Sequence, residues 1–411
     1  MLSALPAPER HWLSQLQAEA ARRGLELYLV GGSVRDLLLG RPVLDLDLVL
    51  EGDAIHFGRA VQAHLGGTLT VHDKFRTATW QTPEGLSLDL ITARRETYPA
   101  PASLPVVTSS TLADDLARRD FTINTLALRL SDGLLIDQYQ AQADLRAGLI
   151  RVLHPLSFQD DPTRLYRAVR YATRYGFQIV PETRALVSGA LPFVQALSPE
   201  RIRHELDLVL DEPNALQTLA ELSELGLLRA VLDKLPWNST LATRLAAARQ
   251  LPLLSDWNLT SPAAGIPLNR ALLYLLWLLD LSSADLELVQ ERLVFPLGLF
   301  KSLLAASTLR LALPALAGAA PSEWVKKLTG QPLLAIYALA LVSGESALIA
   351  YLARWQFIQP QATGETLKSL GLPPGPVYQT LLWQLRAAWL DGLVKSPGEE
   401  TALLGQLLAR E

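Results

Sequence analysis

The 411-residue sequence contains no cysteine, and this absence excludes several kinds of chemistry. Without thiols the chain has no disulfide, no thiolate zinc site and no cysteine nucleophile, so it is not a secreted disulfide scaffold. Unbroken apolar runs are short: Ala271–Leu279, for example, has less than half of the ~20 residues that span a bilayer. The first residues also lack the basic and apolar regions of a signal peptide. We therefore expect a cytoplasmic protein that does not enter a membrane.

Charged residues are few, at 19% of the chain, and 37 basic against 41 acidic side chains leave a net charge of −4. This balance argues against a surface that is cationic throughout. It does not exclude nucleic acid, because a local basic stripe is enough to contact phosphates. With 49% apolar residues the chain is not disordered, and its length predicts two to four domains at roughly 100–200 residues each.

Two regions differ in their pattern of apolar residues. Up to about Leu153, short strand-like runs alternate with helical segments. From about Asp161 onward, leucine and alanine recur at helical spacing with almost no alternation. The predicted fold class is therefore α+β, with a head of strands and helices followed by an all-helical remainder. We expect strands over Leu25–Val30, Val43–Leu50, Thr68–Val71 and Leu86–Thr92, and a short helix over Val34–Leu39.

The second of these strands carries two carboxylates. Asp45 and Asp47 are two residues apart and share one face of Val43–Leu50, while the alternating leucines, Leu44 among them, point to the other. Neighbouring carboxylates repel each other, and a divalent cation such as Mg²⁺ stabilises them because it prefers hard oxygen ligands.

Asp89 lies on the polar face of the later strand over residues 86–92. If the two strands pair, three carboxylates converge on a patch that can hold metal ions for phosphoryl transfer. The alternative is that Asp45 and Asp47 are the solvated side of an amphipathic strand, since Asp-x-Asp alone is a weak motif.

A glycine turn precedes the carboxylate strand by about ten residues. Gly31, Gly32 and Ser33 follow a strand and open a helix, so that free backbone N–H groups face outward and favour an anion such as a triphosphate. Arg35, one turn into the helix, adds a cation. The alternative is a tight turn with Ser33 as an ordinary N-cap.

A polar cluster begins the helical segment over residues 116–128. In this cluster Arg119 suits a phosphate, and Asp120 with Asn124 suits sugar hydroxyls. Alternatively, Asp120 only caps the helix and the arginine is solvated.

Residues 159–177 are predicted to form a helix with an arginine stripe. Pro162 suits the first helical position, and Asp161 before it suits the N-cap. Four arginines follow on one side of the helix, where they repel each other unless an anion lies across them. Asp161 and Arg164 together also match the donor and acceptor edge of a cytosine or adenine base. The alternative is a solvated basic face. The four arginines are Arg164, Arg167, Arg170 and Arg174.

These motifs in combination resemble the class II tRNA nucleotidyltransferase and bacterial poly(A) polymerase family, over about residues 28–210. The resemblance implies a nucleotidyltransferase head with a mixed β-sheet (residues 1–145), a helical neck for base recognition (146–210), a helical body (211–310) and a helical tail that binds tRNA (311–411). It rests on Gly31-Gly32-Ser33-Val34-Arg35-Asp36, Asp45-x-Asp47, Arg118-Arg119-Asp120-Phe121-Thr122-Ile123-Asn124, Asp160-Asp161-Pro162-Thr163-Arg164 and Ser198-Pro199-Glu200-Arg201-Ile202.

The resemblance also implies a role for each matching residue. Nucleotide binding falls to Gly32, Arg35, Arg119, Asp120, Asn124, Asp161, Arg164, Arg167 and Arg170, and Mg²⁺ binding to Asp45 and Asp47. The glycine turn adds Gly31 and Ser33 to the nucleotide-binding residues, and the strand faces add Asp89 to Asp45 and Asp47 as catalytic residues. Glu200 and Arg201 match a motif that braces the neck. The chain departs from the family pattern at Asp160, where a glutamate is common, and over residues 136–145, which lack a Gly-Gly pair.

The expected activity is template-independent, Mg²⁺-dependent addition of C, A or both to a tRNA 3′ end from CTP and ATP, with release of pyrophosphate. We favour addition of C, with or without the final A, and infer no obligate protein partner. The alternatives within the family are an A-adding enzyme and a poly(A) polymerase. Outside it, they are a nucleotidyltransferase for small molecules and a non-catalytic RNA-binding protein.

Overall fold

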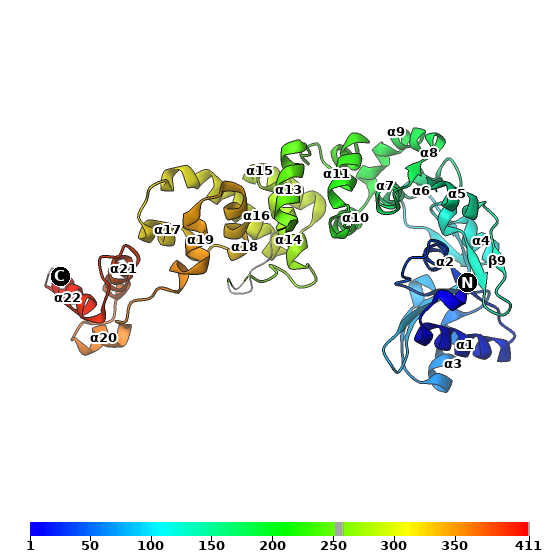
Figure 1. Cartoon of the computed structure of the whole chain (residues 1–411), viewed down its shortest axis with the longest axis horizontal. Helices are drawn as coiled ribbons and strands as arrows, with labels where there is room; N and C mark the ends of the chain where they lie inside the picture. The colour runs from blue at the N-terminus through cyan, green and yellow to red at the C-terminus, as the bar shows by residue number, and fades with distance from the viewer. Residues whose placement is uncertain (251–256, 258, 410–411) are drawn as a thin grey trace. The chain divides into compact units, whose positions relative to one another are not determined.

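The computed structural model describes residues 1–250, 257 and 259–409, which form two compact units, Met1–Asp233 and Lys234–Glu411 (Figure 1). The first unit contains the β-sheet and the second is helical. The predicted change from strands and helices to helices alone is confirmed. The finer boundaries after residues 145, 210 and 310 remain predictions.

A seven-stranded mixed sheet forms the centre of the first unit, in the order β3-β4-β5-β2-β1-β8-β9. β2 and β5 are parallel, and the other neighbouring pairs are antiparallel. β6 and β7 form a separate hairpin. The strands are β1 (Leu27–Val30), β2 (Asp47–Leu50), β3 (Thr68–His72), β4 (Thr77–Gln81), β5 (Ser87–Thr92), β6 (Arg94–Thr97), β7 (Val106–Ser109), β8 (Ala127–Arg129) and β9 (Leu135–Ile136).

Apolar side chains cover both faces of this sheet. α3 (Ala54–Leu65) packs on β3, β4 and β5 and contacts α1 (Ala7–Arg22), and Phe57 and Trp80 are fully buried (Figure 1). A second cluster includes Val30, Val49, Leu112 and Leu116. The last two belong to α4 (Leu112–Ala117), while α2 (Gly32–Leu38) follows β1 directly.

The predicted strand over residues 43–50 is shorter than expected, because only Asp47–Leu50 is extended in the sheet. β1 ends at Val30, where Gly31 turns the chain with φ 65°, so β1 does not continue alongside residues 43–46. Leu44 is 88% exposed rather than buried, and Asp45 lies outside the strand. Leu46 and Leu48 are buried as the alternation predicted, whereas Leu44 is exposed and Val49, on the face of Asp45 and Asp47, is buried.

Helices complete the first unit after the sheet. α7 packs against α10 and α11, and β10 pairs in parallel with β11 as a small addition to this helical part. These elements are α5 (Ala141–Ala147), β10 (Leu149–Ile150), α6 (Ser157–Asp160), α7 (Thr163–Tyr175), β11 (Gln178–Ile179), α8 (Pro181–Ala185), α9 (Val187–Ala190), α10 (Pro199–Asp211), α11 (Ala215–Glu224) and α12 (Leu227–Val231).

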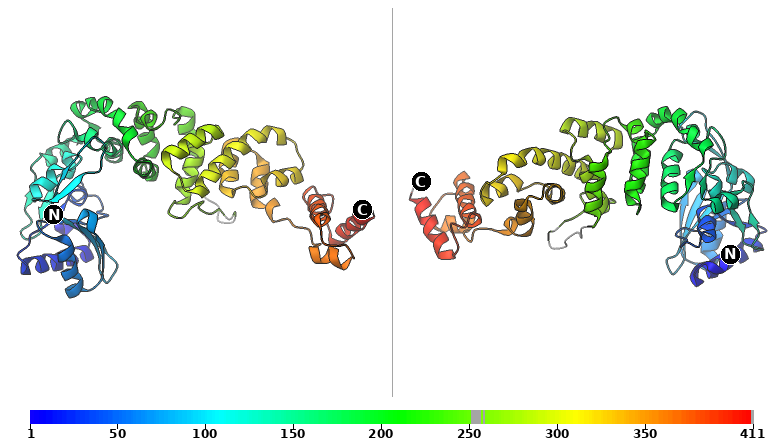
Figure 2. Two further views of the ribbon diagram at one scale, coloured as in Figure 1. Left: turned by 180° about the vertical axis from the view of Figure 1, so that it is seen from behind. Right: turned by 45° about the horizontal axis from the view of Figure 1, so that its top comes forward.

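The second unit has no strand among its described residues, as both views of Figure 2 show. Leu297–Leu316 is long and apolar enough for a membrane span, with a mean hydropathy of 1.3. Its helix α16 packs against α14, α15 and α18. A helix in the core of a protein can be as long and as apolar as this one, so its length and composition are weak evidence for a membrane span. The helices are α13 (Ser239–Gln250), α14 (Leu268–Leu278), α15 (Ser283–Leu293), α16 (Leu297–Ala312), α17 (Pro321–Leu328), α18 (Leu333–Ser343), α19 (Ser346–Ala353), α20 (Gly364–Ser369), α21 (Pro376–Leu390) and α22 (Pro397–Leu408).

Candidate active site

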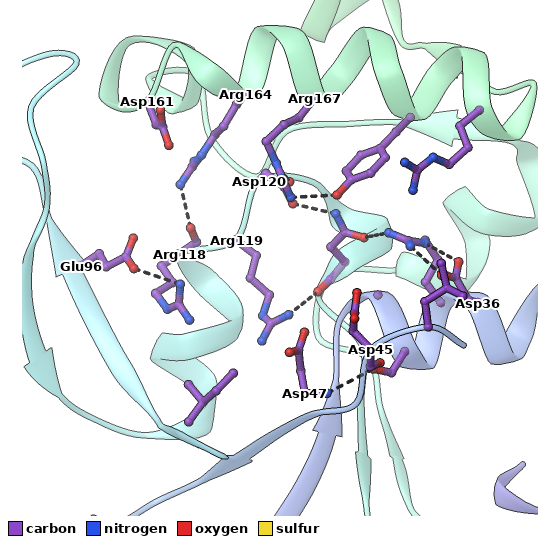
Figure 3. A pocket seen from close by; sticks show the side chains of 18 of the residues that line it. Asp36, Asp45, Asp47, Glu96, Arg118, Arg119, Asp120, Asp161, Arg164 and Arg167 are labelled. Atoms are coloured by element: carbon purple, nitrogen blue, oxygen red, sulfur yellow. Dashed lines mark hydrogen bonds and ion pairs between the residues drawn. The ribbon is translucent and has the colours of Figure 1, made fainter. Parts of the chain in front are cut away.

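A polar cavity of about 550 Å³ in the first unit collects most of the predicted site residues. Figure 3 shows Arg164 and Arg167 extending from α7 on one side, Asp45 and Asp47 on the other, and Arg119 between them. The predicted residues that line the cavity are Gly32, Ser33, Arg35, Asp45, Asp47, Arg119, Asp120, Asn124, Asp161, Arg164 and Arg167. Gly31, Asp89 and Arg170 do not line it.

The pair of carboxylates lies where β2 begins. Asp47 is half-buried, and Asp89 is its direct partner across the parallel β2–β5 pair. Burial raises the pKa of Asp47 to about 6, because the charged form is poorly solvated; Arg119 opposes the rise, and the charges of Asp89 and Asp45 add to it. A bound cation would relieve both the burial cost and the repulsion.

The predicted convergence of three carboxylates on a metal is not seen. Asp89 stands beside Asp47, but its Oδ1 accepts a hydrogen bond from the Thr79 hydroxyl at 2.6 Å. Among the described residues, no group of three or more histidine or acidic side chains is arranged to hold a metal. Asp45 and Asp47 still fit a divalent ion that takes its other ligands from phosphate oxygens and water.

The glycine turn brings α2 close to the carboxylates. Gly31 permits this turn in two ways, since it has a positive φ and a Cβ added there would lie 2.2 Å from Nη1 of Arg119. Ser33 donates a hydrogen bond from its hydroxyl to the Asp45 carbonyl at 2.7 Å. The backbone N–H of Asp47 donates to the same hydroxyl at 3.4 Å. Ser33 therefore ties the carboxylate segment to α2, a role that its position in the motif did not predict.

Arg119, Asp120 and Asn124 form one hydrogen-bonded group beside the cavity. Asp120 accepts from Nδ2 of Asn124 and from Nε of Arg167, each at 2.8 Å. Burial alone would raise the pKa of Asp120, but Arg167 and Asn124 hold it down at about 2. Arg119 contacts Asp115 at 2.9 Å, and its buried Nε has no partner among the described residues. The group is thus preorganised, with an unsatisfied donor at the cavity.

The proposed base-reading pair is held by several hydrogen bonds. Arg164 donates to the Ser157 hydroxyl at 2.7 Å and to the Arg118 carbonyl at 2.8 Å. Asp161 Oδ1 accepts from the backbone and the hydroxyl of Thr163, as a residue just before a helix does. Nη2 of Arg201 reaches the same oxygen at 2.6 Å. α7 begins at Thr163 with Pro162 as its N-cap, one residue later than predicted.

Three of the four arginines on the α7 stripe pair with acids from other elements, and Arg167 does so with Asp120. Arg170 is buried and contacts Glu205 at 3.2 Å and Glu212 at 3.6 Å. Arg174 also pairs with Glu212. These pairs offset the inferred repulsion at Arg167, Arg170 and Arg174, whereas Arg164 bonds to a hydroxyl and a carbonyl. Arg170 supports the α7–α10 contact instead of lining the cavity.

Sequence reasoning missed several residues around the cavity. Glu96 and Tyr98 come from the β6–β7 hairpin, and Tyr171 comes from α7. Glu96 pairs with Arg118 at 3.0 Å and accepts from the Tyr98 hydroxyl at 3.1 Å. Burial raises the pKa of Tyr98 above its usual range. No alternation marks this strand in the sequence, because all four residues of Arg94–Thr97 are polar.

Two family models match the chain, one over the sheet region and one over helices that follow it. A family model described as the poly A polymerase head domain matches residues 27–151. A second, described as a probable RNA and SrmB-binding site of polymerase A, matches residues 176–237.

Among individual proteins, the chain is 36% identical over 398 residues to the A-adding tRNA nucleotidyltransferase of Halalkalibacterium halodurans, covering 93% of this chain and 89% of that protein. It is 42% identical over 212 residues to the CC-adding tRNA nucleotidyltransferase of Deinococcus radiodurans, covering 51% and 56%.

Solved structures share the fold along the whole chain. The Thermotoga maritima CCA-adding enzyme complexed with tRNA has a TM-score of 0.78 at 27% identity, covering 100% of this chain and 97% of that one. A CCA-adding enzyme in complex with ATP has a TM-score of 0.80 at 29% identity, with the same coverage.

Proposed function

The chain belongs to the tRNA nucleotidyltransferase family, and we propose that it transfers single nucleotides from CTP or ATP to the 3′ end of tRNA. The 3′-oxygen would form a bond to the α-phosphorus while the bond to pyrophosphate breaks. One observation supports this most directly: the cavity of about 550 Å³ sets Asp45 and Asp47 opposite the arginines of α7. Carboxylates on one side and guanidinium groups on the other suit a reaction between a hydroxyl and a triphosphate.

Enzymes of this family generally use divalent metals, and we propose Mg²⁺ for this chain. Asp45 and Asp47 would hold the ion, and the bound ion would activate the hydroxyl and neutralise charge on the phosphates. The side chains of α2 and α7 bind and orient the nucleotide. Asp45→Ala and Asp47→Ala are each expected to abolish nucleotide incorporation while leaving the fold intact by circular dichroism. Full activity in either variant would contradict the metal assignment.

For the base, we propose that Asp161 and Arg164 read its Watson–Crick edge. Both lie at the start of α7 and line the cavity, and the contacts to Arg201, Ser157 and Arg118 hold them in place. Replacing either residue by alanine should blur the choice between CTP and ATP more than it slows turnover. Unchanged selectivity in both variants would contradict this role.

Among the nucleotides, we propose A as the one that the enzyme adds. The supporting observation is the extent of alignment, since the relative named A-adding matches 93% of the chain and the relative named CC-adding matches 51%. The motifs by themselves favoured C, and the structural similarity to CCA-adding enzymes supports C and A together as the second candidate. Because tRNA is the substrate, we expect the enzyme to act in the cytoplasm.

A primer-extension assay tests the proposal. Purified protein is given tRNA transcripts that lack one, two or three terminal nucleotides, with labelled CTP and ATP supplied separately. We expect one A on the transcript that lacks only that nucleotide, and no addition to the shorter two. Addition of C to the shorter transcripts would favour CC or CCA addition. Transfer to a small molecule without tRNA, or no Mg²⁺-dependent transfer at all, would contradict the proposed function.

A further inference from the structure

The guanidinium of Arg35 lies against two tyrosine rings of α7, and neither ring has a role in the function proposed above. Cζ of Arg35 is 4.8 Å from the ring centre of Tyr175 and 5.2 Å from that of Tyr171. Arg35 is only 4% exposed. A guanidinium within about 6 Å of an aromatic face is attracted by the ring, and the attraction is strongest when water is excluded.

Hydrogen bonds hold the same guanidinium on its other sides. Nε and Nη2 donate to the two carboxylate oxygens of Asp36 at 2.9 Å each, and Nη1 donates to Oδ1 of Asn124 at 2.6 Å. These bonds use three of the five N–H donors of an arginine. Among the described residues no further acceptor takes the remaining two. Arg35 lines the cavity, and Nη2 lies 3.5 Å from where a Cβ on Gly32 would stand.

Tyr175 contacts both members of the Arg35–Asp36 pair. Its ring faces the guanidinium, and its hydroxyl donates to Oδ1 of Asp36 at 3.2 Å. A second guanidinium, that of Arg41, lies 4.7 Å from the same ring centre. Asp36 is the neighbour of Arg35 on α2 and moves with it, whereas Tyr175 belongs to α7. Asn124 also holds Arg35 from outside α2, but the two tyrosine rings are the side chains of α7 that contact Arg35 directly.

The two helices joined in this way carry different parts of the site. α2 begins at the glycine turn and holds the carboxylate segment through Ser33. α7 carries Arg164 and Arg167, which reach the cavity from the other side. Contact between Arg35 and the rings thus fixes the distance between α2, which is proposed to bind the phosphates, and α7, which is proposed to read the base. A small error in that distance would slow catalysis.

We propose that Tyr175, with Tyr171 beside it, is a positioning residue that holds Arg35 so that its two remaining N–H groups meet the phosphates of the incoming nucleoside triphosphate. The inference rests on the proposed function, because it takes the cavity to bind a triphosphate. Tyr175 acts through Arg35 and does not touch the nucleotide.

Equilibrium binding by calorimetry tests this on the full chain, with ATP and inorganic tripolyphosphate as separate ligands in the presence of Mg²⁺. Tyr175→Leu should raise the Kd of both ligands about tenfold, because the attraction between the ring and the guanidinium is lost. Tyr175→Phe keeps the ring and should stay within about threefold of the wild type. Arg35→Lys keeps the charge but loses the planar contacts, and should resemble Tyr175→Leu. The double variant of Arg35→Lys and Tyr175→Leu should bind no more weakly than Arg35→Lys alone.

Two results would overturn the inference: unchanged binding in Tyr175→Leu, or losses that multiply in the double variant as those of independent sites do. Thermal unfolding of each variant shows whether it is folded. If Tyr175→Leu does not fold, Tyr175→Met replaces it in both the single and the double variant. A wild-type chain that binds neither ligand would contradict the proposed function itself. Normal wild-type binding with multiplying losses would contradict only the role of Tyr175.

Discussion

The carboxylate Asp47 should lower the stability of the metal-free protein, so removing its charge should make the first unit more stable while abolishing activity. Burial raises its pKa from 3.8 to about 6. At about 1.4 kcal/mol for each pH unit of difference, the ionised form costs about 3 kcal/mol at pH 7 as an upper estimate, since Asp47 is only half-buried. Asp47→Asn should recover most of this.

The pH dependence has a definite sign. The folded state binds this proton more tightly than the unfolded state, so the cost is absent below pH 3.8, grows between pH 3.8 and about 6, and is complete above that range. Stabilisation by Asp47→Asn should therefore be large at pH 7 and small at pH 4. Added Mg²⁺ should stabilise the wild type but not the variant, because only the wild type retains both carboxylates.

Scanning calorimetry in a chelator at pH 7 and pH 4 measures the effect. For a unit of this size a gain of about 3 kcal/mol corresponds to a rise in Tm of roughly 6–12 °C. Asp132→Asn is the matched control: Asp132 pairs with Arg129, which holds its pKa down at about 2, so this variant should not gain stability. The reasoning is refuted if Asp47→Asn is no more stable than the wild type at pH 7, or if its gain is the same at pH 4.

Two further variants test other contacts of the site. Gly31→Ala should lower kcat/KM at least tenfold, because the new Cβ would displace Arg119. Gly40 has the same φ of 65° but no neighbour within 4 Å of an added Cβ, so Gly40→Ala should lower stability without that loss of activity. Equal losses of kcat/KM in the two variants would contradict the steric argument. Arg201→Ala removes the 2.6 Å contact that holds Asp161. The preference between ATP and CTP, measured as the ratio of their kcat/KM values, should then move closer to one. An unchanged ratio would show that Asp161 does not need this contact.

Local patterns in the sequence predicted four strands of the sheet, β1, β2, β3 and β5, and missed β4, β8 and β9. The helical segment predicted over residues 116–128 is wrong, because α4 ends at Ala117 and the chain then forms a short 3-10 helix and strand β8. β5 runs over Ser87–Thr92, close to the range that the alternation of polar and apolar residues predicted, while its pairing with β2 beside Asp47 was only a condition of the argument. The change to helices after the sheet also followed from periodicity, because the spacing of apolar residues depends on the local backbone alone. The cavity residues were identified in another way, because most of them match motifs of the family that the sequence resembles.

Only the tertiary structure decided which partner each charged or polar side chain meets. The Arg170 side chain lies on the predicted stripe, yet Glu205 from α10 neutralises it. Ser33 does not cap α2, whose N-cap is Gly31, and instead holds the Asp45 segment. Tyr175 contacts Arg35, which is 140 residues earlier in the chain. Periodicity determines the face on which a side chain lies, but the packing of distant elements determines what stands opposite that face, and the energy of a charge depends on its neighbours and its burial.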